Sequence, residues 1–256
     1  MKRINNLKEL SYEFLKWKNK VNKVNRYYES KLLDLLYDNR ELFVYEILKG
    51  SNFFRGRIFD IEEVVSTNNQ YEEWRNDALT DFQGYSKNDS GAPPAKYAIE
   101  NRLNGKGISY LYTCKNINTV IYELRPTINE KISIAEFVTK KDLLLADLTN
   151  IKANQMERDM ESQLLTDLLR KIAEEFSIPH NIGHNYSFTQ YLAGHFANMG
   201  FDGIIFKSSL DSKGENYVFF NPKDCEAIRS NLYIVNGISI DHKPITRQDI
   251  KYYDEQ

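Results

Sequence analysis

The sequence predicts an α+β protein built around a mixed sheet. From Leu7 to Leu48, apolar residues recur mostly at spacings near three and four, as amphipathic helices require. From Phe53 onward, short strand-like segments and further helical segments follow one another without the regular alternation of a βαβ protein. The chain has 256 residues, of which 41% are hydrophobic, and this is enough for a sizeable core.

The first 48 residues are predicted to form a helical N-terminal region of two or three helices. Residues 1–26 contain eight Lys or Arg and two Glu, a local excess of six positive charges. Such a run is typical of a solvated helix face, and an acidic partner is the alternative. The region could therefore dock a partner, cover a cleft or belong to the core.

The next segment, Phe53–Phe59, is predicted to be a strand. Arg55 and Arg57 then share one face, since strand side chains two apart point the same way. A polar stretch of unusual length, 60–107, follows, and connections this long are more often functional than idle. Ser109–Cys114 is predicted to be the next strand.

A helix is expected to begin after Asn116, an N-cap residue, and to end at Pro126. The apolar positions of this helix form one stripe: Ile117, Val120, Ile121 and Leu124. Glu123 lies at the border of that stripe, where a helix meets the edge of a cleft.

The second half of the chain alternates further strands and helices. Strands are predicted at 132–137, 143–148, 203–206 and 216–220, and a long helix at about 155–176. Ser187 and Gln190 match a capping box, which predicts a helix from Ser187 to near Gly200. We assign 49–240 to a catalytic domain and 241–256 to a C-terminal tail.

Composition excludes several classes of function. The net charge of −2 provides no general basic field for a nucleic acid or an anionic membrane. No stretch approaches the roughly 20 apolar residues of a membrane span, and the N-terminus lacks a signal-peptide core, so we expect a cytoplasmic protein. Cys114 and Cys225 match no zinc or disulfide pattern, and no metal site is expected. His180, His184 and His195 are interpreted as loop and helix histidines.

Several blocks of the sequence together resemble the RES domain family, named for Arg, Glu and Ser. Residues 101–112, NRLNGKGISYLY, are similar to that family's GRxNxxGxxxxY motif, with Asn101 in place of the usual glycine. Residues 54–57, FRGR, resemble its opening strand, and Glu123 stands eleven residues after Tyr112, as in the family. Residues 203–209 and 216–220 resemble its later blocks.

The resemblance implies a fold similar to ADP-ribosyltransferases and an enzyme that degrades NAD⁺ by hydrolysis or phosphorolysis. NAD⁺ is then a substrate, and no cofactor is implied. Many such proteins are toxins restrained by a partner antitoxin, so an inhibitor protein is an expected partner. The sequence leaves the oligomeric state open.

The same resemblance assigns roles to seven residues. Breaking the nicotinamide–ribose bond passes through an oxocarbenium-like state that a carboxylate stabilises, and Glu123 is the acid in the matching position. Tyr112 offers a ring for nicotinamide to stack on. Arg55 completes the expected catalytic set and, with Arg102, is a candidate for binding the pyrophosphate. The other NAD⁺-binding candidates are Asn104, Arg57 and Ser208.

Two alternatives remain open at this point. Transfer of ADP-ribose to a protein uses the same bond cleavage with another acceptor. A non-catalytic interaction module would use the lysine-rich helices as its surface. RNA cleavage by the N-terminal region is not expected, because the arginine–histidine pair typical of such nucleases is missing and no histidine precedes His180.

Overall fold

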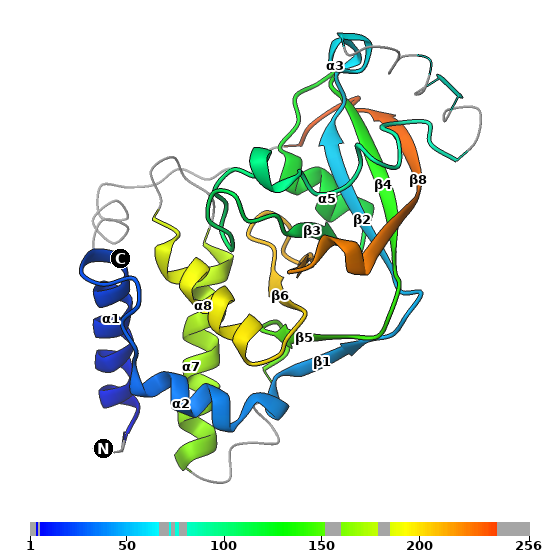
Figure 1. The fold of residues 1–256 in the computed structure, drawn as a ribbon. Coiled ribbons are helices and arrows are strands. Elements are labelled where there is room, and N and C mark those ends of the chain that lie inside the picture. The colour runs from blue at the N-terminus through cyan, green and yellow to red at the C-terminus, as the bar shows by residue number, and fades with distance from the viewer. Residues whose placement is uncertain are drawn as a thin grey trace, which may run out of the picture.

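One mixed sheet of eight strands in the described residues forms the centre of the fold, and most of the helices gather beside one end of it (Figure 1). The computed structural model describes residues 4, 6–66, 72, 75, 76, 81–151, 160–178 and 185–239. The strand order is β1-β5-β6-β7-β3-β2-β4-β8, and β5 and β6 are the parallel pair. The strands are β1 (Val44–Ile47), β2 (Asn52–Ile58), β3 (Leu111–Cys114), β4 (Lys131–Thr139), β5 (Leu143–Asp147), β6 (Gly203–Lys207), β7 (Glu215–Phe219) and β8 (Cys225–Ile234).

The helices confirm the α+β prediction. They are α1 (Leu7–Lys23), α2 (Lys31–Asp38), α3 (Ile61–Ser66), α5 (Ile117–Leu124), α7 (Met160–Ser177) and α8 (Ser187–Asn198), with short 3₁₀ turns at Arg40–Leu42, Ala95–Tyr97 and Pro222–Asp224. No helix in the described ranges is long and apolar enough to cross a membrane.

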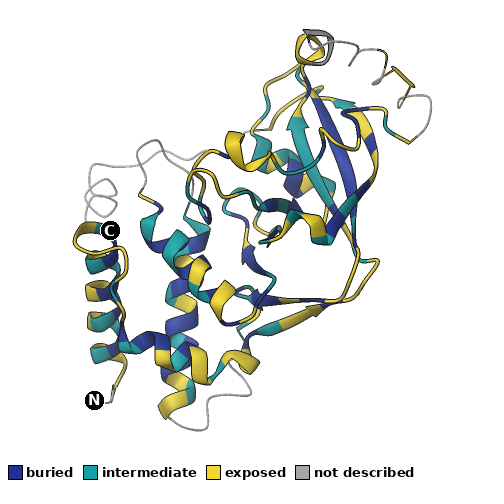
Figure 2. Cartoon of the chain, in the orientation of Figure 1, coloured by how far each residue is buried: buried dark blue, intermediate teal, exposed yellow. Residues whose placement is uncertain are grey.

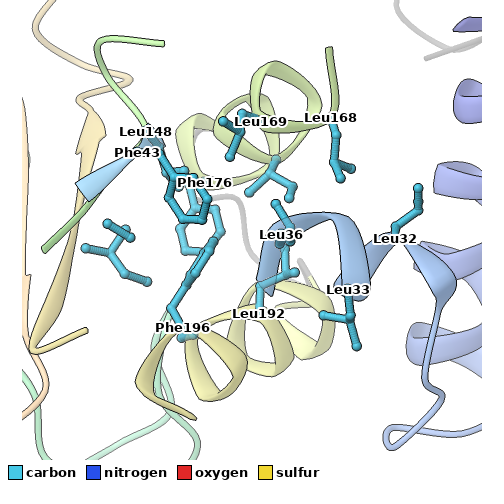
Figure 3. Packing of buried hydrophobic residues seen from close by; sticks show 14 of the residues in the cluster. Leu32, Leu33, Leu36, Phe43, Leu148, Leu168, Leu169, Phe176, Leu192 and Phe196 are labelled. Atoms are coloured by element: carbon cyan, nitrogen blue, oxygen red, sulfur yellow. The ribbon is translucent and has the colours of Figure 1, made fainter. Parts of the chain in front are cut away.

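A large apolar core joins the helices to one face of the sheet. Figure 3 shows Leu36 of α2 beside Leu192 of α8, and Phe176 of α7 beside Phe43 and Leu148. Phe176 and Phe196 are fully buried. Trp17 of α1 packs edge-on against Phe188 of α8, with ring centroids 5.2 Å apart. The facing surfaces of these helices are buried while their outer surfaces are exposed (Figure 2). The helical layer therefore provides a rigid support for the sheet.

The predicted helical N-terminal region is helical over most, but not all, of its length. Asn6 and Ser30 cap α1 and α2, each accepting a backbone N–H with its side-chain oxygen. Val44–Ile47, however, is a strand that pairs with β5 at the edge of the sheet. Buried Phe43 and Ile47 lie four residues apart and imitate helical spacing, but tertiary pairing determines the backbone here. The described part of residues 1–48 thus contributes to the common core and sheet.

The predicted capping box at Ser187 is wrong. The N-cap residue of α8 is Tyr186, whose side chain makes no capping bond, and Asn185 Oδ1 accepts the Ser187 N–H at 2.8 Å. The Gln190 amide instead donates to Glu100, Asn101 and Asn104 of a distant loop. These tertiary hydrogen bonds replace the bond back to the helix N-terminus that a capping box requires. The start of the predicted helix at 155, His180, His184 and the tail 241–256 lie outside the described residues.

Candidate active site

A cavity of about 670 Å³ lies where β2 and β3 separate. These strands pair at one position, Phe54 with Cys114. The positions that would continue the antiparallel pairing, Arg55 with Thr113 and Gly56 with Tyr112, line the cavity instead. The loop 98–104, the last turn of α5 and the start of β7 complete its walls. The separation of the two strands therefore creates a concave site of the size that small ligands use.

Glu123 enters this cavity from the last turn of α5. The helix begins at Asn116, whose side chain accepts the Thr119 N–H at 2.8 Å, and ends at Arg125 in the left-handed region with φ 50°. The Oε1 atom of Glu123 accepts hydrogen bonds from Ser208 Oγ at 2.7 Å and Asn216 Nδ2 at 2.8 Å. Both bonds end on the same oxygen, and Oε2 accepts no hydrogen bond from the residues that the structure describes.

The two donors to Glu123 are themselves held in place. Ser208 is buried, and its Oγ accepts the backbone N–H groups of Leu210 and Asp211, so its own proton is directed at the carboxylate. Asn216 Oδ1 accepts from Cys114 Sγ at 3.3 Å, which orients the amide with its NH₂ group toward Glu123. The carboxylate is thereby fixed by residues from β7 and from the loop after β6.

Tyr112 and Asn104 form a second polar unit in the cavity wall. The Tyr112 hydroxyl donates to Asn104 Oδ1 at 2.7 Å and accepts from the Leu103 N–H at 3.2 Å. Burial raises the pKa of Tyr112, so the phenol stays neutral at physiological pH. Asn104 Nδ2 donates to the carbonyls of Ile99 and Ile108. The Asn104 amide is thus occupied in shaping the loop.

Two cavity arginines lack carboxylate partners within the described part of the chain. Arg55 donates to the Ser90 carbonyl at 2.9 Å, and burial together with neighbouring Arg57 lowers its pKa to about 10. Arg102 donates to the carbonyls of Phe176 and Ile178 at the C-terminal end of α7. Burial lowers the pKa of Arg102, while Tyr186 and Glu123 act in the opposite direction. Both guanidinium groups suit an anion from outside the chain.

The structure brings five of the seven predicted residues to the cavity wall: Glu123, Tyr112, Arg55, Arg102 and Asn104. Ser208 lies just behind Glu123 and contacts it directly. Arg57 does not line the cavity; it pairs with Glu63 at 3.2 Å, donates to the Asp89 carbonyl and lies over the Tyr85 ring. These partners hold its side chain near α3 and residues 85–89.

Sequence reasoning missed two cavity residues, Asn216 and Arg125. Asn216 opens a predicted strand, and no local pattern connects it with Glu123, 93 residues earlier. Arg125 stands where the helix ends, and its cavity position depends on the left-handed backbone there. A lone sequence does not reveal either contact, because both depend on tertiary placement.

Comparison with known proteins identifies the family. No curated protein matches the chain. Among solved structures, a chain of the M. tuberculosis MbcT–MbcA toxin–antitoxin complex is similar, with a TM-score of 0.43 and 11% identity, covering 78% of this chain and 93% of that one. This likeness is too low to support an argument about function. The RES domain model matches residues 54–239, well over half of the sequence, and the chain therefore belongs to the RES domain family.

Proposed function

We propose that this chain cleaves NAD⁺ at the bond between nicotinamide and ribose. The observation that carries the proposal is the Glu123 carboxylate, which is fixed through one oxygen by Ser208 and Asn216 in a cavity that also contains Arg55 and Arg102. A carboxylate fixed in this way, beside two arginines without carboxylate partners in the described residues, suits a substrate that carries a pyrophosphate and develops positive charge at a sugar carbon.

The carboxylate has a defined task in this reaction. As the ribose C1′–N bond breaks, its electron pair leaves with neutral nicotinamide and the ribose gains oxocarbenium character. Glu123 Oε2 stabilises that charge or holds a ribose hydroxyl, while the bonds to Oε1 keep the carboxylate oriented. An acceptor then adds to C1′ and completes the reaction.

The remaining cavity residues bind and orient the substrate. Arg55 and Arg102 bind the pyrophosphate, and Arg102 retains three further N–H groups beyond the two that its α7 bonds use. The Tyr112 ring stacks on nicotinamide while its hydroxyl stays bonded to Asn104. Asn104 acts by holding the loop in shape, and Ser208 acts through Glu123.

An enzyme that destroys NAD⁺ in its own cytoplasm requires restraint. We infer that the chain is a toxin or defence effector, with an inhibitor protein as its partner and NAD⁺ as a substrate. Membership of the RES domain family supports this biological setting. The reaction as described requires no additional cofactor.

Product analysis tests the proposal. Purified protein is incubated with NAD⁺ in the presence and absence of inorganic phosphate, and products are separated by chromatography. Release of nicotinamide is expected, with ADP-ribose from hydrolysis or ADP-ribose 1-phosphate from phosphorolysis. Nicotinamide release with ADP-ribose bound to protein would indicate transfer. A folded protein that leaves NAD⁺ intact under all these conditions would contradict the proposal and favour an interaction module.

A further inference from the structure

The loop 98–104 has little regular structure of its own, although it carries Arg102. Asn101 and Asn104 exchange backbone hydrogen bonds, and Asn101 Oδ1 accepts the Arg102 N–H at 2.8 Å. These contacts shape the loop locally. Its place in the cavity wall must come from contacts outside the loop, because short loops without a ladder of hydrogen bonds are otherwise mobile.

The first turn of α8 supplies part of those outside contacts, beside the Tyr112 hydroxyl that bonds to Leu103 and Asn104. Thr189 Oγ1 lies 2.6 Å from the Arg102 carbonyl, closer than its alternative acceptor, the Tyr186 carbonyl at 3.1 Å. Gln190 Nε2 lies 2.9 Å from the Asn101 carbonyl and 3.2 Å from the Asn104 carbonyl. Two side chains of one helical turn thus bind the carbonyls of three loop residues.

Both side chains are oriented for this task by their surroundings. Thr189 is buried, and its neighbours Phe188 and Leu192 are fully buried in the helical core. Gln190 Oε1 accepts from Arg26 Nη2 at 3.2 Å, which directs the NH₂ group of the amide toward the loop. Because α8 is packed in the core, its two side chains hold the loop in a fixed place relative to the core.

The side chain of Arg102 is held from the same layer. Its guanidinium donates to Ile178 O at 2.7 Å and to Phe176 O, at the end of α7. The backbone of the arginine is fixed by α8 and its head by α7. A rigid placement of this kind reduces the entropy that the arginine loses when an anion binds.

We propose that Thr189 and Gln190 are positioning residues for Arg102, and that they set the affinity of the cavity for the pyrophosphate of NAD⁺. This inference rests on the proposed function. Neither residue lines the cavity, so both act through the loop. Their effect belongs to substrate binding, since the contacts that hold Glu123 come from Ser208 and Asn216 and are independent of α8.

Steady-state kinetics on matched variants test the proposal. Thr189→Val keeps the size of the side chain and removes its hydroxyl, and Gln190→Met removes the amide. Each should raise KM for NAD⁺ about three- to tenfold, the equivalent of about 0.6–1.4 kcal/mol, and leave kcat within about twofold. Thr189→Ser keeps the donor and should restore KM. Ser187→Ala is the control in the same turn, because Ser187 is not the N-cap residue of α8. This variant should have the wild-type KM and kcat.

The outcomes separate this inference from the proposed function. Wild-type protein that cleaves NAD⁺, with folded Thr189→Val and Gln190→Met variants of unchanged KM, would overturn the positioning role alone. A fall in kcat at constant KM, or failure of Thr189→Ser to restore KM, would also overturn it. Wild-type protein that neither binds nor cleaves NAD⁺ would remove the proposed function and this inference together. Thermal melting of every variant identifies effects of misfolding.

Discussion

The most informative residue contacts of this molecule meet at one oxygen atom. Glu123 Oε1 receives both Ser208 and Asn216, so a serine and an asparagine far away in sequence determine how the glutamate faces the cavity. The sequence predicted Ser208 as an NAD⁺-binding residue. Its buried position and its bond to Glu123 instead support a role in orienting the acid.

Asn216 should contribute measurably to turnover. Asn216→Ala removes one of the two donors to Glu123 and should lower kcat about tenfold or more, since hydrogen bonds to charged groups contribute about 1.5–3 kcal/mol. Initial rates of nicotinamide release measure this effect. Asn231→Ala, at an exposed position of β8, is the matched control and should have wild-type rates. Equal rates for the two variants would show that Asn216 does not support Glu123.

His195 should make the fold sensitive to acid. Its Nδ1 is buried without a hydrogen-bond partner in the described residues, its ring lies 4.4 Å from that of Tyr191, and burial lowers its pKa below the ordinary 6.5. Below pH 6.5 the unfolded chain binds a proton that the folded chain accepts less readily, so stability falls as pH decreases through this range.

Denaturant unfolding at several pH values tests this prediction. The free energy of unfolding of wild-type protein should fall from about pH 7 to about pH 5, and His195→Phe should reduce that fall. Parallel pH profiles for the two proteins would show that His195 is not responsible.

At the scale of elements, α5 is the part that brings Glu123 to the cavity, and Gly56 of β2 allows its close approach. A Cβ atom at Gly56 would lie 2.5 Å from Val120 Cγ1 and 2.7 Å from Leu124 Cδ1. Both are side chains of α5. The helix can therefore lie this near to the sheet only because position 56 has no side chain.

Gly56→Ala should displace α5 and weaken the fold. We expect a loss of about 1–3 kcal/mol in the free energy of unfolding and a lower rate of NAD⁺ cleavage. Gly194→Ala is a control of opposite sign: its Cβ would meet nothing within 4 Å, and alanine favours helix by about 1 kcal/mol. Chemical denaturation measures both. A Gly56→Ala protein with wild-type stability and rate would contradict the close packing of α5.

The sequence predicted elements well where local patterns agree with tertiary contacts. The helix after Asn116 has a cap, an apolar stripe and a proline stop, and α5 follows all three. β8 was not predicted, because exposed Ile228 and Leu232 and buried Ser230 break the alternation expected of a strand. The strand also carries one extra residue, Ile228, where its register with β4 shifts between Glu136 and Phe137. β1 and the Gln190 contacts were missed because distant residues determine them.

At the scale of the whole molecule, the N-terminal helices belong to the structural core. Leu10, Phe14, Trp17 and Val21 are buried along one side of α1, and Lys18 pairs with Glu175 of α7 at 2.6 Å. Lys8, Lys16 and Lys23 are exposed, whereas the buried side of α1 packs against α7 and α8. Residues of α7 and α8 also bind Arg102, so the helical layer is connected directly to the cavity wall.

Deleting residues 1–26 should prevent stable folding. The four buried side chains of α1 contribute about 1.5–3 kcal/mol each, or about 6–12 kcal/mol together, which is comparable with the whole stability of a domain at about 5–15 kcal/mol. Solubility and cooperative melting of the truncated chain test this. Leu15→Ala, on the exposed face of α1, is the control and should fold normally. A soluble, cooperatively melting fragment would show that α1 is a detachable appendage.

The measurement that tests the central claim most directly is the rate of nicotinamide release by Glu123→Gln. The substitution keeps size and shape and removes the charge that stabilises the oxocarbenium. We predict a kcat at least about a hundredfold below wild type, with NAD⁺ affinity by calorimetry changed little. Glu46→Gln, at an exposed position of β1, should keep the wild-type rate. A folded Glu123→Gln protein that releases nicotinamide at nearly the wild-type rate would contradict the account.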